Sequence, residues 1–516
     1  MQRTDVANPA YYHKVVDCQW ACPAHTNVPE YIRLIAQGRF TDAYVLNRES
    51  NVFPGILGRT CDRPCEPACR RTRVDGKAVA ICRLKRVAAD HKDDVRDRLP
   101  VAPAEKNGKR IALVGAGPAS LTVANDLMPL GYECTIFEKG PRPGGLMRVN
   151  IPAFRLPEEV LDEEIGYITG MGVEMRYDTP VESLRTLVDS QEFDAVFVGS
   201  GAPKGKELEL PGRFDTDQVF IGIEWLESIH FGHVDSVGAR VLIIGVGNTA
   251  MDCCRSAKRL VATDVKVIAR KTRKYFKASP WELEDAEEER VDILENHSPV
   301  RLRDRGRPVD GYGVRYVHVP RENGRPGIRS RPAGRSLPAT VIPAIGQENA
   351  FPWIERDMGL DLTAEHARRR QGDVHVDAAG CVLRRRRRVR TGEHHLGGRA
   401  RPRGSHLHPQ LPPGVPVTER PAQGQTLTST KMGLHEWAYS NDYSPVARQK
   451  MTHVDMPLRF SKMTIEVEQG FTADQAQHEV ERCLNCDVQT HFTDSLASSA
   501  MPASTFARRL PDHHAQ

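Results

Sequence analysis

The chain has 516 residues, too many for one core, and roughly 100–200 residues per domain predicts three or four domains. Its 40% hydrophobic and 27% charged residues are ordinary for a globular protein, and we find neither an 18-residue apolar run nor a signal-peptide core, so we expect a cytoplasmic protein without membrane contact. The net charge of +5 comes largely from the run Arg384 to Arg388, so we expect no nucleic-acid partner.

Residues 1–105 combine short helical patterns with half of the twelve cysteines. These six are Cys18, Cys22, Cys61, Cys65, Cys69 and Cys82. Thiolates grouped about three residues apart, with prolines at the turns, suit [4Fe–4S] ligation. A zinc site is an alternative, although six cysteines exceed one tetrahedral site, and inert buried thiols are another. We predict a small helical iron–sulfur domain.

A strand, glycine turn and helix begin after the polar linker that ends at residue 108. Gly115, Gly117 and Ser120 open the helix, and Ser120 stands where glycine or alanine is usual. Glycines let backbone amides approach a pyrophosphate, which the helix N-terminus favours. Glu138 ends the next strand, 23 residues after Gly115, where an acid can bind a ribose hydroxyl. This pattern predicts a dinucleotide site.

A second unit of the same kind starts at Arg240. Its turn carries Gly245, Gly247 and Ala250, and its second strand ends in basic residues, namely Arg270, Lys271 and Arg273. Basic side chains there can pair with a 2′-phosphate and favour NADPH, whereas a solvated basic loop is the alternative. Cys134, Cys253 and Cys254 lie within these two units and are expected in their cores. The fold class is therefore α/β, with two doubly wound, Rossmann-like domains after the helical domain.

Several strings resemble one family, that of the glutamate synthase small (beta) subunit. GAGPASL, FEKGPRPGGL and IPAFRLP are similar to its FAD domain, and GVGNTAMD to its NADPH turn. The strings CPAHTNVPEYI and NVFPGILGRTCDRPCEPAC resemble the N-terminal cluster domain that the family shares with dihydropyrimidine dehydrogenase. The resemblance covers roughly residues 15–300, 338–360 and 424–492.

The resemblance implies a cofactor for each site, with two NAD sites as the alternative. The implied FAD-binding residues are Gly115, Gly117, Pro118, Ala119, Ser120, Glu138, Lys139, Gly145, Leu146, Arg155 and Gly346. The implied NADPH-binding residues are Gly245, Gly247, Asn248, Thr249, Ala250, Arg270, Lys271 and Arg273, with Asp252 also at a matching position. Since the cofactors carry the chemistry, we nominate no catalytic side chain.

The cluster ligands depart from the family pattern, because its first cysteine pair, expected upstream of Cys18, is missing. One cluster can be completed by Cys22, Cys61, Cys65 and Cys82. Cys18 and Cys69 then lack two ligands. Cys483 and Cys486, in the late pair CLNC, could supply these if the C-terminus folds back.

Residues 381–408 match no fold, at the place where the family carries its second FAD contact. If permitted codons are chosen for the residues from Cys381 onward and read one base later, the translation contains GGDAA, the missing glycine–aspartate box. Residues 496–508, read two bases later, can encode a ferredoxin-like cysteine motif. We therefore infer frameshifts, with a divergent basic insert and tail as the alternative. Five adjacent arginines cannot be buried unpaired, so residues 365–420 are expected to be irregular and FAD binding by this chain weak.

The predicted domains are an iron–sulfur domain (1–105), a FAD domain (106–235 and 336–460), an NADPH domain (236–335) and a C-terminal extension (461–516). The predicted function is electron transfer between NADPH, FAD and [4Fe–4S] clusters, with a partner subunit or ferredoxin as acceptor or donor. A non-catalytic iron–sulfur scaffold that has lost flavin is the rival. A thioredoxin-reductase-like enzyme would need a Cys-x-x-Cys in a dinucleotide domain, and neither domain has one.

Overall fold

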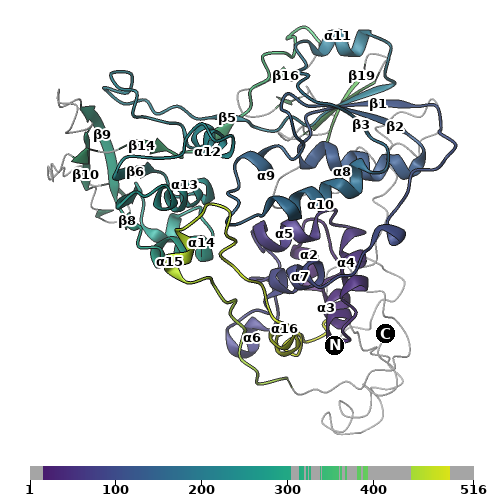
Figure 1. The fold of residues 1–516 in the computed structure, drawn as a ribbon, viewed down its shortest axis with the longest axis horizontal. Helices are drawn as coiled ribbons and strands as arrows, with labels where there is room; N and C mark the ends of the chain where they lie inside the picture. The colour runs from purple at the N-terminus through teal and green to yellow at the C-terminus, as the bar shows by residue number, and fades with distance from the viewer. Residues whose placement is uncertain are drawn as a thin grey trace.

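The structure is a computed structural model that describes residues 16–303, 340–358 and 443–487, and the backbone of short strands between 313 and 392. Figure 1 shows a helical domain below two sheet-containing units. Within the described residues, no helix is both long and apolar enough to span a bilayer.

The helical domain is built from short helices whose apolar faces meet in one core. They are α2 (Asp17–Ala21), α3 (Val28–Ala36), α4 (Phe40–Arg48), α5 (Pro54–Thr60), α6 (Thr72–Asp75), α7 (Ile81–Asp90) and the 3-10 turn η1 (Arg96–Arg98). Tyr31, Ile35 and Leu84 are almost completely buried in this core. Prolines in the first turns of α3 and α5 lack an amide hydrogen that would have no partner there. The helical domain is therefore folded as the periodicity predicts.

The first dinucleotide unit has four parallel strands in the order β4-β1-β2-β3. Its elements are β1 (Arg110–Val114), α8 (Pro118–Leu127), η2 (Met128–Leu130), β2 (Glu133–Phe137), α9 (Leu146–Val149), α10 (Glu158–Thr169), β3 (Glu174–Arg176), α11 (Leu184–Asp189) and β4 (Ala195–Val198). Helices α8 and α10 lie between this sheet and the helical domain (Figure 1). The doubly wound fold predicted from the first glycine turn is confirmed.

Two strands extend this sheet where an irregular stretch is expected. β18 (Gly380–Arg384) pairs antiparallel with β4, and β19 (Arg388–Gly392) pairs antiparallel with β18. The expectation of irregular backbone over 365–420 is therefore wrong for these segments and for the short strand β17 (Ala367–Arg368), which pairs with β16 (Asp361–Leu362). Main-chain hydrogen bonds can form a ladder whatever the side chains are. The other residues of that stretch, and the shifted tail, lie outside the described residues.

The second dinucleotide unit is a parallel sheet in the order β14-β6-β7-β8. Its elements are α12 (Gly222–His230), β6 (Arg240–Ile244), α13 (Asn248–Arg259), β7 (Asp264–Ile268), η3 (Arg273–Tyr275), α14 (Pro280–Glu288), β8 (Asp292–Leu294) and β14 (Thr340–Pro343). A small antiparallel sheet of β9 (His297–Arg303), β10 (Gly313–His318) and β13 (Leu337–Pro338) lies at its edge, and β11 (Arg321–Glu322) pairs with β12 (Arg325–Pro326). A further pair joins β5 (Lys204–Gly205) to β15 (Gln347–Glu348).

The boundaries of this unit differ from the predicted ones. The late apolar strand β14 pairs with β6, and α12 packs against α13, so both belong to the second unit and not to the FAD domain. An apolar strand can enter either parallel sheet, because both bury their strands on two faces.

Residues 443–487, here called the C-terminal strap, run along the second unit and end on the helical domain (Figure 1). The strap contains α15 (Met456–Arg459) and α16 (Ala473–Val480). Phe471, Ala476 and Val480 are buried in the core of the helical domain. The C-terminus thus folds back as the late cysteine pair requires, whereas residues 443–460 do not join the first dinucleotide unit as predicted.

The strap is also fastened by buried charge. Charge-assisted pairs join the strap to arginines and acids of the helical domain; they are Arg33–Asp487, Arg59–Glu466, Arg83–Glu468, Arg448–Glu66 and Arg482–Asp75. Breaking a buried ion pair costs about 3–5 kcal/mol, because one charge is left without compensation. The strap is therefore an integral part of the helical domain.

Candidate cofactor sites

The first glycine turn is shaped for close approach by a phosphate. Gly115 has a φ of +86°, and a Cβ there would lie 3.2 Å from the carbonyl oxygen of Gly199. Gly145 has a φ of +52° and faces Gly117, with only 3.0 Å between its would-be Cβ and the Gly117 Cα. Ser120 is buried, and its hydroxyl donates to the Val114 carbonyl at 3.4 Å, so this departure from the family pattern is accommodated.

Glu138 is buried at the end of β2, with its carboxylate held by two backbone amides. Its oxygens accept from the amides of Ala116, at 2.6 Å, and Gly140, at 2.9 Å. The carboxylate therefore has a fixed direction beside the glycine turn.

One cavity of about 1430 Å³ joins the three units. Its lining includes fourteen of the predicted site residues: Cys22, Cys61, Cys65, Gly115, Gly117, Pro118, Ala119, Glu138, Lys139, Gly145, Leu146, Arg155, Asn248 and Thr249. Pockets for one small ligand are typically 300–1,000 Å³, so this cavity has room for a large dinucleotide. Gly346 does not line the cavity, although its neighbour Gln347 does.

Arg155 bridges the two dinucleotide units inside this cavity. Its guanidinium pairs with Asp252 of α13 at 2.6 Å and with Glu282 of α14. Burial raises the pKa of Asp252 to about 6, against the opposing effect of Arg155. Arg155 lines the cavity, but both arms of its guanidinium are already engaged by carboxylates.

Asn248 connects the second glycine turn to the helical domain. Its amide nitrogen donates to Asp62, beside Cys61, at 3.3 Å, and its oxygen accepts from the Ser279 amide at 2.9 Å. The other residues of this turn, Gly245, Gly247 and Ala250, position the start of α13 without lining the cavity. The side-chain amide of Asn248 is thus held from both sides.

The three basic residues after β7 differ in their surroundings, although all are exposed. Arg273 pairs with Glu287, and its amide donates to Glu295 at 3.0 Å. Lys271 lies 5.8 Å from the ring centre of Tyr275. Among the described residues, Arg270 has no carboxylate partner, so it is the basic side chain most available to a phosphate.

The first cysteine group consists of Cys22, Cys61, Cys65 and Cys82. The first three line the shared cavity. Cys82, which lies on α7, is hydrogen-bonded to Cys61 and lies outside that lining. Cys82 is 1% exposed, and its sulfur lies 3.3 Å from the Leu57 carbonyl oxygen. The hydrogen bond with Cys61 lowers the pKa of Cys82 to about 6, and nearby cations act in the same direction. Four thiols therefore converge at the wall of the cavity.

The second cysteine group consists of Cys18, Cys69, Cys483 and Cys486. All four line one small pocket between α2, α3 and the end of the strap. Burial raises the pKa of Cys483 to about 12 and that of Cys486 to about 11, so these thiols are neutral until a metal displaces their protons. Residues more than 400 positions apart in the chain thus form one site.

The two cysteine groups are neighbours. Cys65 of the first group acts electrostatically on Cys18 of the second, together with Cys69 and the two strap cysteines. All eleven cysteines that the structure describes are free thiols, and Cys134, Cys253 and Cys254 are buried in the dinucleotide units as expected. The donor set suits two four-thiolate iron–sulfur sites, one next to the other.

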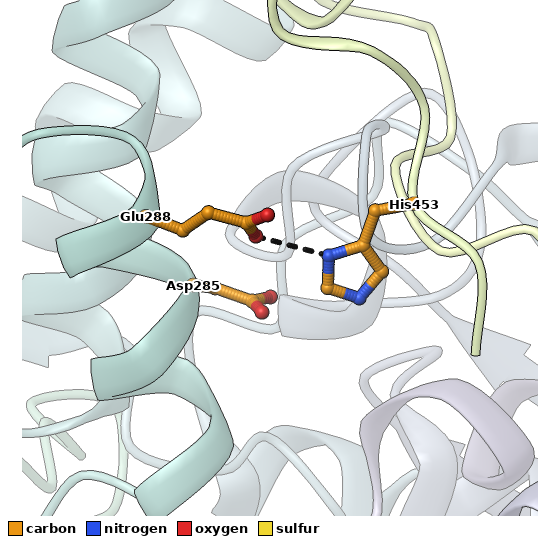
Figure 2. Close-up of side chains that lie close together, drawn as sticks. All are labelled: Asp285, Glu288 and His453. Carbon is orange, nitrogen blue, oxygen red and sulfur yellow. Dashed lines mark hydrogen bonds and ion pairs between the residues drawn. The ribbon is translucent and has the colours of Figure 1, made fainter. Parts of the chain in front are cut away.

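One further acidic group contains no cysteine. Figure 2 shows Asp285 and Glu288 of α14 beside His453 of the strap. Their charges are already compensated, because Arg255 pairs with Asp285 and Arg459 pairs with Glu288, both at 3.0 Å. This group is an ion-pair junction between the strap and the second unit.

Two family models match the chain. Residues 6–96 match the dihydropyrimidine dehydrogenase domain II with a 4Fe–4S cluster, and residues 109–325 match the pyridine nucleotide-disulphide oxidoreductase domain. These are the regions in which the sequence predicts the cluster domain and the glycine turns.

Curated relatives cover most of the chain. It is 30% identical over 382 residues to the glutamate synthase [NADPH] small chain of Escherichia coli, covering 71% of this chain and 78% of that one. The chain belongs to the glutamate synthase small-chain family. It is also 36% identical over 379 residues to the NADPH-Fe(3+) oxidoreductase subunit beta of Geobacter sulfurreducens, covering 70% of this chain. The NADP(+)-dependent formate dehydrogenase subunit beta of Moorella thermoacetica is 31% identical and covers 91% of this chain.

The chain spans 56% of the length of the Geobacter protein. The comparisons confirm the predicted family, the oxidoreductase class and the cofactor set of FAD, NADPH and [4Fe–4S] clusters. The names "beta" and "small chain" among the relatives indicate a partner subunit.

Three residues of the sites are missed by the sequence analysis. Asp62, Glu282 and Lys85 all contact or face predicted site residues. For Lys85 a signal exists, since it follows Cys82 by three residues and so shares its face of α7.

Proposed function

We propose that this chain is an electron-transfer subunit that passes electrons between NADPH and a partner protein. The observation that carries the proposal is one cavity lined by the first glycine turn, by Asn248 and Thr249 at the start of α13, and by three cysteines of the first group. The second group lies immediately beyond. A bound FAD would supply the chemistry that links hydride transfer from NADPH to single-electron transfer to iron–sulfur clusters.

The residues of the chain would bind and orient these groups. Gly115, Gly117 and Gly145 leave room for the FAD pyrophosphate, and the fixed carboxylate of Glu138 would accept from ribose hydroxyls. Asn248 would hold the nicotinamide nucleotide at the start of α13, where the helix dipole favours phosphate. None of these residues has to exchange a proton.

We assign four ligands to each cluster. Cys22, Cys61, Cys65 and Cys82 would hold the cluster nearer the cavity, and Cys18, Cys69, Cys483 and Cys486 the cluster beyond it. Cys483 and Cys486 of the second set would take the place of the cysteine pair that the family pattern puts upstream of Cys18. Clustered free thiols fit the reducing cytoplasm, where we place the protein.

Anaerobic purification tests the proposal. The full chain, supplied with excess FAD because weak flavin binding is expected of it, should contain about eight iron and eight sulfide per chain and should reduce a dye with NADPH. Iron without flavin would favour the rival function of an iron–sulfur scaffold. The frameshift hypothesis stays a prediction, and the sequence of the gene decides it.

A further inference from the structure

Lys85 is a buried cation that faces the first cysteine group. It lies on α7, three residues after Cys82, and is only 7% exposed. Its side chain lines the shared cavity together with Cys22, Cys61 and Cys65. Within the described part of the chain, neither a carboxylate nor any hydrogen-bond acceptor is paired with its ammonium group.

Such an ammonium group needs an anion nearby, because an uncompensated charge is unfavourable away from water. Neighbouring basic residues of α7 satisfy this need with carboxylates, as Arg83 does with Glu468 and Arg86 with Asp90. Lys85 instead lies one helical turn after Cys82 on α7 and lines the same cavity as Cys22, Cys61 and Cys65. A lysine side chain is cationic at neutral pH, so its ammonium group places a positive charge beside these cysteines.

Among the residues that the structure describes, the second cysteine group has no unpaired cation of this kind beside its pocket. The cations beside its pocket are Arg70 and Arg71, and each is already paired with a carboxylate, Asp17 and Asp75 respectively. The charges of these two arginines are compensated within the protein. The charge of Lys85 can instead compensate an anionic cluster bound by the first group.

We propose that Lys85 is the charge-compensating residue of the first cysteine group, where its ammonium raises the reduction potential of the bound cluster above that of the second group. This inference rests on the proposed function, since it takes both groups to hold clusters. Reduction adds one electron and no bond changes, so a fixed positive charge in a site of low dielectric favours the reduced form. Electrons that arrive from the cavity would therefore reside first on the cluster of the first group.

The test is an EPR-monitored potentiometric titration of the full chain, purified anaerobically, against Lys85→Met and Lys85→Arg. Lys85→Met should make reduction of the first cluster at least tenfold less favourable, which is about 59 mV for a one-electron couple. The signal of the second cluster should not move. Lys85→Arg should keep the parent potential, and Lys77→Met, at an exposed lysine of the same domain, should change neither.

The signal of the first group is identified as the one that survives Cys483→Ser. Two clusters with unchanged potentials in Lys85→Met would overturn the role of Lys85 and leave the proposed function intact. A parent protein without two clusters would overturn both. If Lys85→Met fails to retain the first cluster, Lys85→Arg decides the matter. A parent-like potential supports the charge account, and a potential lower by about 59 mV or more contradicts it.

Discussion

The two cysteine groups contain four thiols each, yet they are built in different ways. The first comes from one short stretch of helices and faces the cavity, with the unpaired charge of Lys85 beside it. The second takes half of its thiols from the strap, and the cations around it are paired with carboxylates. The first group thus depends on local structure and the second on a long-range contact, which makes the two separable by experiment.

The largest expected effect comes from removing the strap thiols. The double change Cys483→Ser and Cys486→Ser should lower the iron content from about eight to about four per chain, because only the second group loses ligands. Flavin reduction by NADPH should persist, whereas electron delivery to an external protein should fall. Cys253→Ser, in the core of α13, is the control and should keep all the iron. Loss of both clusters in the double variant would mean that the groups are not independent.

The next effect comes from detaching the strap without touching a ligand. Asp487 follows Cys486 and pairs with Arg33, and both side chains are buried. Asp487→Asn should destabilise the docked strap by about 3–5 kcal/mol, so the second cluster should lose iron to a chelator at least a hundredfold faster. The first cluster should lose iron at the parent rate. Asp474→Asn, at an exposed position of α16, provides the matched control, and equal rates in the two variants would contradict the account.

A smaller effect is expected at the basic residues that follow β7. Arg270→Ala should weaken the binding of NADPH by roughly 1.5–3 kcal/mol and the binding of NADH only slightly, since a charge-assisted contact to the 2′-phosphate would be lost. Arg273→Ala should weaken the binding of NADPH less, because Arg273 already pairs with Glu287. Binding is measured by titrating the flavin absorbance of each variant. Equal losses for NADPH and NADH would show that the 2′-phosphate is not recognised here.

The smallest effect concerns the junction of the strap with the second unit (Figure 2). Hydrogen bonds from Arg459 and His453 lower the pKa of Glu288 below its usual 4.5. The stabilisation is therefore fully present above pH 4.5 and is lost as the pH falls through the lower, folded-state pKa. Hydrogen exchange of residues 450–459 should rise in that range in the parent but be pH-independent in Glu288→Gln, apart from the intrinsic exchange rate. A parent that behaves like the variant would remove Glu288 from the junction.

The sequence predicts most of the fold, because each element rests on local signals. Gly115 and Gly245 mark the two parallel sheets, and the helical periodicity over residues 28–50 predicts α3 and α4. The sheet that β14 joins is set by packing and is not encoded in the strand itself. The strands β18 and β19 form through backbone pairing, although their sequence argues against burial.

The sites divide in the same way. The first cysteine group follows from spacing, whereas the second requires the strap to dock, and its ion pairs join residues hundreds of positions apart. Lys85 is overlooked because a lysine on an amphipathic helix usually faces water, whereas here α7 packs against α5 and Lys85 is buried at the cavity that the cysteines line.

The most direct test of two adjacent clusters is the EPR spectrum of the chemically reduced full chain. The account predicts two signals that integrate to about two spins per chain and are broadened by magnetic interaction, because Cys65 and Cys18 bring the groups together. The double change at Cys483 and Cys486 should leave one sharp signal of about one spin. A single unbroadened signal in the full chain, unchanged by the double substitution, would contradict the account.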